Sequence, residues 1–180
     1  MSAIPISLEK LIKQFTKLPG IGRKTAERLS IFILKETDES VLEFSDALKS
    51  LKENIKTCEN CHCFIEEICL LCLERNKNII CLVEHPTDVF LIDKSGFKGM
   101  YHVFGGLISP LDGITPDVLN FNTLLSRLDD VQEIVVALNP SSEGDMTNLY
   151  LAELLVDNDI EITRIARGIP IGSSLEFIDQ

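Results

Sequence analysis

The chain has 180 residues and a formal net charge of −11, and 45% of its residues are hydrophobic. This composition is typical of a globular protein with enough apolar material for one large domain or two small ones. The chain starts without the basic and apolar regions of a signal peptide, and no stretch approaches the ~18 apolar residues of a membrane span. We therefore expect a cytoplasmic protein and exclude a membrane protein.

Charge is unevenly distributed along the chain. Residues 1–57 hold ten Lys and Arg against eight Asp and Glu, a net charge of +2, whereas residues 58–180 hold seven against twenty, a net charge of −13. Phosphate contacts require Lys and Arg, so any polyanion should bind the N-terminal region. The acidic remainder should repel phosphate or face a basic protein.

Three helices are predicted in the N-terminal region. Apolar residues at helical spacing predict a short helix over residues 7–17 with Ser7 as its N-cap, and a second helix that runs to about Lys35. A third helix is predicted over residues 40–56. Its apolar positions, which we assign to packing, are Val41, Phe44, Leu48, Leu51 and Ile55.

The turn before the second helix carries the first chemical signal. Gly20 and Gly22 suit a tight turn, and the helix that follows starts with unpaired backbone N–H groups at its positive end. A phosphate fits there, within reach of Arg23, Lys24 and Arg28. The plainer alternative is a helix corner with a solvated basic face. The amino-acid sequence of the turn resembles the helix-hairpin-helix motif, which binds the DNA backbone without recognising base sequence.

Four cysteines form two Cys-x-x-Cys pairs, Cys58 with Cys61 and Cys69 with Cys72, separated by seven residues. Four thiolates suit one tetrahedral Zn²⁺ with no open position, so we predict one structural zinc per chain. Two disulfides or a redox pair are the alternatives, but neither accounts for the duplicated spacing. Because the loop between the pairs is short, His62 and Cys63 remain candidate substitute ligands.

After a polar linker at residues 74–78, the pattern becomes that of an α/β domain. The continuous apolar run over residues 79–83 predicts a buried parallel strand. Further strands are predicted at residues 101–104, 133–138 and 160–163. One helix is predicted to start at Pro86, and another is predicted to end near residue 155. A loop-rich insertion between strands, which could contact a partner or DNA, is formed by Gly99, Gly105, Gly106, Gly113 and residues 109–114. Parallel sheets place their working residues beyond the carboxyl ends of the strands.

Two such strand ends resemble the metal-binding edge of a Toprim domain, the fold of topoisomerases, primases and small nucleases. Catalytic members hold Mg²⁺ with a Glu after the first strand and an Asp-x-Asp after a later one, because Mg²⁺ prefers carboxylate ligands. Glu84 is present here, but Asn139 and Ser141 stand where the acidic pair should be, and only Glu143 adds a second charge. We therefore expect a Toprim fold kept for binding, in which Glu84 could simply cap a helix or pair across an interface.

The order of these parts resembles the RecR family of bacterial recombination mediators over residues 8–179. The resemblance rests on Leu18-Pro-Gly-Ile-Gly, Tyr101-His-Val-Phe-Gly-Gly, Leu111-Asp-Gly-Ile and Arg164-Ile-Ala-Arg-Gly-Ile-Pro. It implies an α+β protein with a helix-hairpin-helix region at residues 1–57, a four-cysteine zinc finger at 58–72 and a Toprim domain with a Rossmann-like parallel sheet at 78–172. Residues 173–180 are similar to a Walker-B-like segment, but without a Walker A loop we expect no ATP hydrolysis.

The resemblance also implies a function. Such a protein is a non-enzymatic, nucleoid-associated repair factor that forms a homo-oligomer, a dimer or a tetrameric ring. It acts with RecO, and in many bacteria RecF, to load RecA onto single-stranded DNA. Gly20, Gly22, Arg23, Lys24 and Arg28 would contact single- and double-stranded DNA. RecO, as a basic partner, would meet a Toprim face formed by Glu84, Asp88, Asn139 and Glu143.

The sequence departs from the family in three ways, and two other functions are possible. The spacing between the two Cys-x-x-Cys pairs is one residue shorter than the family's, Ser173-Ser174 replaces a glycine-rich pair, and the chain stops at Gln180, before a tail that helps to join subunits in the family. The rival functions are a Mg²⁺-dependent Toprim nuclease or primase, which Glu84 and Glu143 would serve, and a protein-assembly hub without DNA binding.

Overall fold

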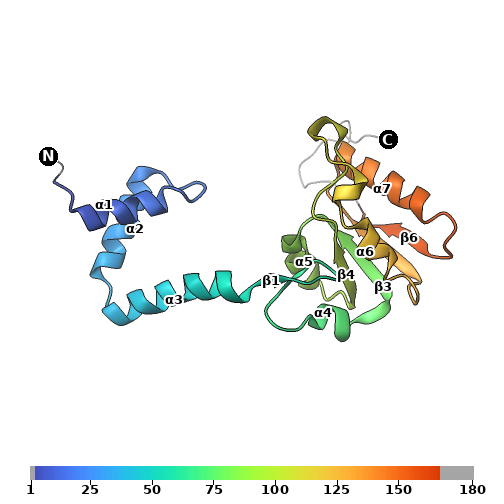
Figure 1. Ribbon diagram of the computed structural model, residues 1–180, viewed down its shortest axis with the longest axis horizontal. Helices are drawn as coiled ribbons and strands as arrows, with labels where there is room; N and C mark the ends of the chain where they lie inside the picture. The colour runs from blue at the N-terminus through green and yellow to red at the C-terminus, as the bar shows by residue number, and fades with distance from the viewer. Residues whose placement is uncertain (1–2, 167–180) are drawn as a thin grey trace. The chain divides into compact units, whose positions relative to one another are not determined.

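The computed structural model describes residues 3–166 and divides the chain into two compact units, residues 1–54 and 55–180 (Figure 1). We describe each unit by itself. The predicted Walker-B-like segment and the Ser173-Ser174 pair lie outside the described residues. No helix in the described range combines the length and the apolar character needed to cross a bilayer.

The first unit consists of α1 (Ile6–Phe15), α2 (Arg23–Lys35) and α3 (Asp38–Asn54), as the sequence predicted. The predicted cap of the first helix is wrong by two positions, because the N-cap is Pro5 and not Ser7. The backbone carbonyl of Pro5 accepts the N–H of Glu9 at 3.0 Å, so the helical ladder already begins at Ile6. A proline with φ of −58° is compatible with this start.

Packing in the first unit is concentrated between α1 and α2. Ile12 of α1 is buried, and α2 buries Ala26 and Ser30, two small side chains one turn apart that allow close approach of the helices. The α3 apolar residues do not pack within the chain, contrary to the assignment, since α3 has no buried residue and Leu48 and Leu51 are more than half exposed. An amphipathic pattern predicts an apolar face but not the element that covers it.

The second unit is built on a four-stranded parallel sheet with the strand order β4-β3-β5-β6 (Figure 1). The predicted α/β architecture is therefore confirmed. Two strands begin earlier than expected. β4 starts at Gly99, two residues before the predicted start, and β3 starts inside the predicted polar linker, where the Asn76 N–H donates to the Lys98 carbonyl at 3.0 Å. The bounds are β3 Asn76–Val83, α5 Pro86–Asp93, β4 Gly99–Val103, α6 Phe121–Leu125, β5 Glu133–Ala137, α7 Ser142–Leu154 and β6 Glu161–Arg164.

Both faces of β3 are covered, which explains its continuous apolar run. Ile80 and Leu82 belong to a core that includes residues of α6 and α7. Cys81 and Val83 belong to a second core on the opposite side, together with Val89 of α5. Successive strand residues point to opposite faces, so a strand buried on both sides needs apolar residues at every position.

The four-cysteine segment is a layer of the second core and not a separate lobe. It contains β1 (Lys56–Thr57) and β2 (Phe64–Ile65), which pair antiparallel, and α4 (Leu70–Leu73). Cys58 and Cys61 are buried in the same cluster as Tyr101 of β4. The Val103 N–H at the end of β4 also donates to the Cys61 carbonyl at 2.9 Å, which joins this segment to the sheet.

The predicted loop-rich insertion follows β4 and contains two short 3-10 helices, η1 (Pro110–Asp112) and η2 (Pro116–Val118). Gly105 has a φ of +83°, a left-handed conformation that favours glycine. The loop is fixed to α7, because the buried Thr147 hydroxyl accepts the Ile108 N–H at 2.8 Å.

Candidate metal centre and nucleic-acid interface

The turn between α1 and α2 has the geometry that the two glycines predicted. Gly20 has a φ of +76°, and the N–H of Ile21 donates to the Leu18 carbonyl at 3.1 Å, which closes the turn. Gly22 is extended and is the N-cap of α2, where its carbonyl accepts the Ala26 N–H at 3.0 Å. The first N–H groups of α2 have no partner inside the helix and are available to an anion.

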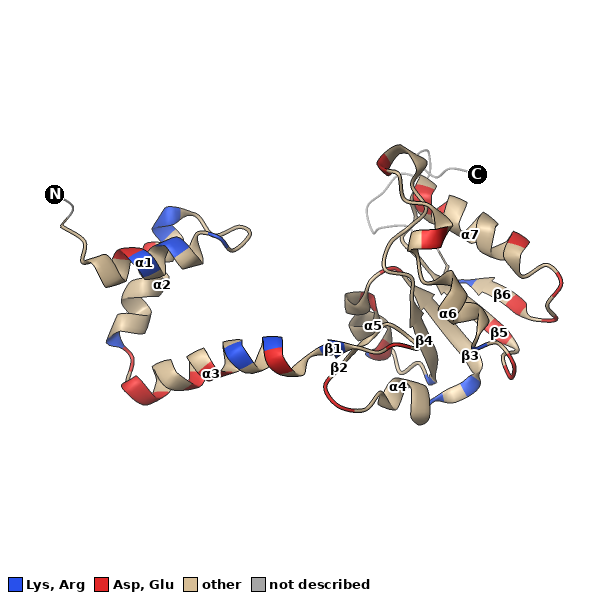
Figure 2. Ribbon diagram, in the orientation of Figure 1, with Lys and Arg blue, Asp and Glu red and all other residues tan. Residues whose placement is uncertain are grey.

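The three basic residues at this turn differ in how they are paired. The Arg23 guanidinium donates to both carboxylate oxygens of Glu9, at 3.1 and 2.9 Å, and to Glu27 at 2.9 Å. The hydrogen bond from Arg23 lowers the pKa of Glu9. Lys24 and Arg28 are exposed, and within residues 3–166 neither forms an ion pair. Lys and Arg gather around this turn in Figure 2.

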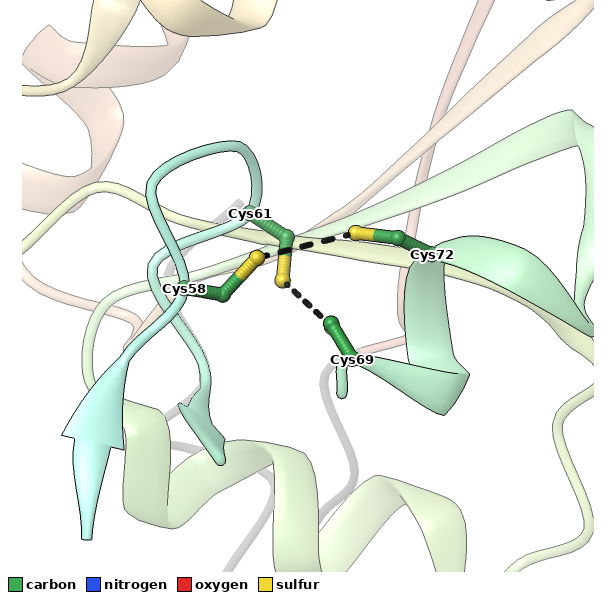
Figure 3. Close-up of side chains that lie close together, drawn as sticks. All are labelled: Cys58, Cys61, Cys69 and Cys72. Carbon is green, nitrogen blue, oxygen red and sulfur yellow. Dashed lines mark hydrogen bonds between the residues drawn. The ribbon is translucent and has the colours of Figure 1, made fainter. Parts of the chain in front are cut away.

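The four predicted metal ligands converge. The sulfur atoms of Cys58, Cys61, Cys69 and Cys72 all lie within 4.8 Å of one another (Figure 3). The Cys61 and Cys69 sulfurs are 3.4 Å apart and those of Cys58 and Cys72 are 4.0 Å apart. A tetrahedral ion with metal–sulfur bonds of about 2.3 Å needs sulfurs about 3.8 Å apart, so the four thiols fit such an ion.

Local backbone structure presents these thiols. Cys58 and Cys61 lie in a turn where the His62 N–H donates to the Cys58 carbonyl at 2.9 Å, and His62 has a φ of 60°. Cys69 caps α4, and the Cys72 N–H donates to the Cys69 carbonyl at 3.1 Å. Two tight Cys-x-x-Cys turns therefore face each other.

The alternative ligands do not join this group. The His62 Nε2 atom lies 2.7 Å from the Thr123 hydroxyl, so the ring is turned toward α6. The Cys63 thiol donates to the Cys61 carbonyl at 3.8 Å and is buried in the core. All six cysteines are free thiols, which leaves the disulfide alternative without support.

Burial and hydrogen bonds within the cluster shift the pKa values of three of the four thiols. Hydrogen bonds from Cys63 and Cys72 lower the pKa of Cys61, while burial raises the pKa of Cys69 to about 11. The hydrogen bond to Cys61 raises the pKa of Cys72 as well. A cation that binds four thiolates would displace these protons, so its binding should weaken as the pH falls.

The predicted Toprim edge lies where the strand order reverses. The chain passes from β3 to β4 on one side and later to β5 on the other, and ligands of open α/β sheets bind at such a switch point. Glu84 follows β3 and Asn139 follows β5, and the Asn139 amide donates to the Glu84 carboxylate at 2.8 Å. The other Glu84 oxygen lies 3.2 Å from Nε2 of His85.

The remaining predicted residues of this edge have structural partners or positions. Ser141 is the N-cap of α7 and accepts the Gly144 N–H at 3.1 Å. Asp88 accepts the His85 N–H at 2.8 Å and caps α5. Glu143 lies in the first turn of α7. Within the described range, the four cysteines are the one group of three or more potential ligands that converge on a point.

Comparison with known proteins agrees with this geometry. A RecR helix-hairpin-helix model matches residues 8–52, and a Toprim domain model matches residues 78–166. Recombination protein RecR of Chlorobaculum parvum is 46% identical over 185 residues, which cover 97% of this chain and 91% of that protein. The chain belongs to the RecR family. RecR of Syntrophotalea carbinolica is 46% identical and RecR of Prochlorococcus marinus 45%, with 90% and 93% of those proteins covered.

RecR membership confirms the resemblance drawn from the motifs and supports a role in recombination. The α+β organisation, with a helical hairpin, a four-cysteine cluster and a Toprim sheet, is confirmed as well. Sequence reasoning missed the contacts that position these parts, such as Glu9 with Arg23 and Thr123 with His62. Single polar residues far apart in the chain carry no pattern that would reveal them.

Proposed function

We propose that this RecR-family chain is a non-catalytic DNA-binding recombination mediator. It would act with RecO, and with RecF in bacteria that use it, to load RecA onto single-stranded DNA. The observation that carries the proposal is the glycine turn, where a chain with a net charge of −11 keeps Lys24 and Arg28 exposed beside the start of a helix. A homo-oligomer, either a dimer or a tetrameric ring, is supported by the uncovered apolar side chains of α3.

The hairpin favours binding to the DNA backbone without base recognition. Helix N–H groups, Gly20 and Gly22 would approach one phosphate, and Lys24 and Arg28 would add charge to the same site. Arg23 is held by Glu9 and Glu27, so it would contribute less to phosphate binding than its two neighbours. Phosphate contacts of this kind serve single- and double-stranded DNA alike.

We propose zinc as the ion of the four-cysteine centre. Four thiolates in a tetrahedral arrangement are soft ligands that suit Zn²⁺, and they leave no open position for a substrate or water. The ion would therefore be structural. It would hold the turn at Cys58 and Cys61 against α4, and so complete the layer that covers one face of the sheet.

The edge formed by Glu84, Asp88, Asn139 and Glu143 would bind RecO. Acidic residues outnumber basic residues in this unit (Figure 2), which favours a basic partner.

Glu143→Lys should weaken RecO binding about fivefold or more at low salt, because it places a repulsive charge on that edge. Fluorescence anisotropy with labelled RecO would measure this change. Glu153→Lys, in the last turn of the same helix, is the matched control. Equal affinities for Glu143→Lys and wild type would remove this edge as the RecO site.

A Mg²⁺-dependent nuclease or primase is the second candidate, because Glu84 occupies the expected strand end. The Asn139 amide donates to Glu84 in place of a second carboxylate, and Ser141 caps α7, so neither supplies charge for Mg²⁺.

Wild-type protein should therefore leave labelled DNA intact in Mg²⁺ or Mn²⁺. Gel analysis of the products would test this, with Glu84→Gln in parallel. Cleavage by wild type that disappears in Glu84→Gln would establish the enzyme and refute the mediator proposal.

A further inference from the structure

Arg127 lies just beyond α6 and contacts the sheet and the four-cysteine segment together. Its Nη1 atom donates to the Tyr101 carbonyl at 3.0 Å and to Nδ1 of His102 at 3.1 Å. His102 can accept this bond because its Nε2 atom lies 2.8 Å from the Asn120 carbonyl, an acceptor that requires the proton on Nε2. The same Nη1 makes a longer contact of 3.5 Å with the carbonyl of Asn60, between the first two ligands.

The second terminal nitrogen of the Arg127 guanidinium, Nη2, lies near two sulfur atoms. It lies 3.8 Å from the sulfur of Cys72 and 3.5 Å from the sulfur of Met100. One planar group therefore reaches the turn that holds Cys58 and Cys61 and also a ligand from the second pair. The sulfur atoms of the two cysteine pairs also contact each other.

No carboxylate neutralises Arg127 among residues 3–166, although Asp129 and Asp130 line the same surface pocket. The acceptors at Tyr101, His102 and Asn60 are all neutral. A dication bound by four thiolates carries a net charge of about −2. That centre would supply the negative charge that this half-buried cation lacks, at the sulfur of Cys72.

We propose that Arg127 is a positioning residue of the metal centre, which compensates the excess negative charge of the metal-bound thiolates and holds Cys72 in place relative to the Asn60 turn. The inference rests on the proposed zinc centre and assigns a residue outside the cysteine motif to it. Partners that hydrogen-bond metal ligands commonly change metal affinity about 10- to 100-fold when they are replaced. Removal of Arg127 should therefore speed metal loss more than it disturbs the fold.

Arg75 provides a matched control in the same unit. Its guanidinium donates to the Phe97 carbonyl and to the Asp93 carboxylate, both at 2.6 Å, and neither partner is a cysteine. It therefore braces the end of α5 and the loop before β4 with two hydrogen bonds, but its charge is neutralised by Asp93. A general loss of bracing would appear in Arg75 variants as well, whereas an effect on the metal would not.

The test uses the full chain as wild type, Arg127→Met, Arg127→Lys and Arg75→Met, with bound zinc counted in each. Transfer of zinc to a chromophoric chelator should be about tenfold faster for Arg127→Met and intermediate for Arg127→Lys, which keeps the charge but loses the fork. Arg75→Met should stay within about twofold of wild type. In Co²⁺-substituted protein, Arg127→Met should shift the sulfur-to-cobalt charge-transfer band to lower energy, because the thiolate loses an N–H donor.

Wild-type release rates together with an unchanged cobalt spectrum in Arg127→Met would overturn the inference, as would equal acceleration in Arg75→Met. If Arg127→Met does not fold, Arg127→Lys decides the question by the same two measurements, and a wild-type rate and spectrum there would also overturn it. Wild-type protein without metal would refute the proposed zinc centre itself, before any variant is compared.

Discussion

Lys24→Glu and Arg28→Glu should each weaken binding of both single- and double-stranded DNA about tenfold or more in roughly 0.1 M salt. Each change removes an exposed cation beside the start of α2 and places a carboxylate where phosphate would lie. Arg23→Gln should have a smaller effect, because Glu9 and Glu27 already occupy the Arg23 guanidinium. Fluorescence anisotropy with labelled oligonucleotides would measure the three affinities.

The dependence of affinity on salt gives a sharper test. Each lost phosphate contact should reduce the slope of log K against log salt by about 0.9 for duplex DNA and about 0.7 for single strands. Lys52→Glu makes the same charge change on exposed α3, away from the turn, and should keep the wild-type slope. If Lys24→Glu and Lys52→Glu have the same affinity and slope, the turn does not bind DNA and the long-range charge alone accounts for any effect.

Removal of the metal should destabilise the second unit by several kcal/mol and lower its melting temperature by about 10 °C or more. The large effect follows from the position of the thiols, because Cys58 and Cys61 are buried in the core that covers one face of the sheet. Circular dichroism before and after chelation, with elemental analysis for zinc, would measure it. Cys69→Ser should reproduce the loss, since three thiolates leave the tetrahedral site incomplete.

Cys63→Ala is the control for these metal experiments. Its thiol is buried beside the centre but lies outside the converging group, so the variant should keep one zinc per chain. Its moderate loss of stability would come from the missing side chain alone. Wild-type protein that melts at the same temperature with and without metal would contradict a structural role for the ion.

Patterns that lie within short segments were sufficient to predict the four-cysteine cluster and the hairpin. The Cys-x-x-Cys spacing of the thiols can be recognised within a short stretch of sequence, and both glycines of the turn lie within three residues of each other. The parallel sheet could also be predicted, because a strand buried on two faces needs apolar residues throughout. The prediction placed Glu84 and Asn139 at strand ends, and the parallel pairing of β3 with β5 brings those ends together.

Features that depend on distant partners could not be predicted in this way. The apolar face of α3 is visible in the sequence, but burial depends on a second surface that the pattern does not specify. Arg127 and Thr123 reach Cys72 and His62 only when the segment after β4 packs beside the four-cysteine segment. Asn139 could be recognised as a missing carboxylate, whereas its hydrogen bond to Glu84 required the folded sheet.

The order of the chain gives the buried thiols a further consequence during synthesis. All four ligands emerge from the ribosome before β3, the first strand of the sheet that they cover. A nascent chain that bound the proposed ion would present a folded apolar surface to the strands that follow, whereas a chain without the ion would leave reduced thiols exposed to oxidation. The yield of native protein should therefore follow the supply of metal at the time of translation.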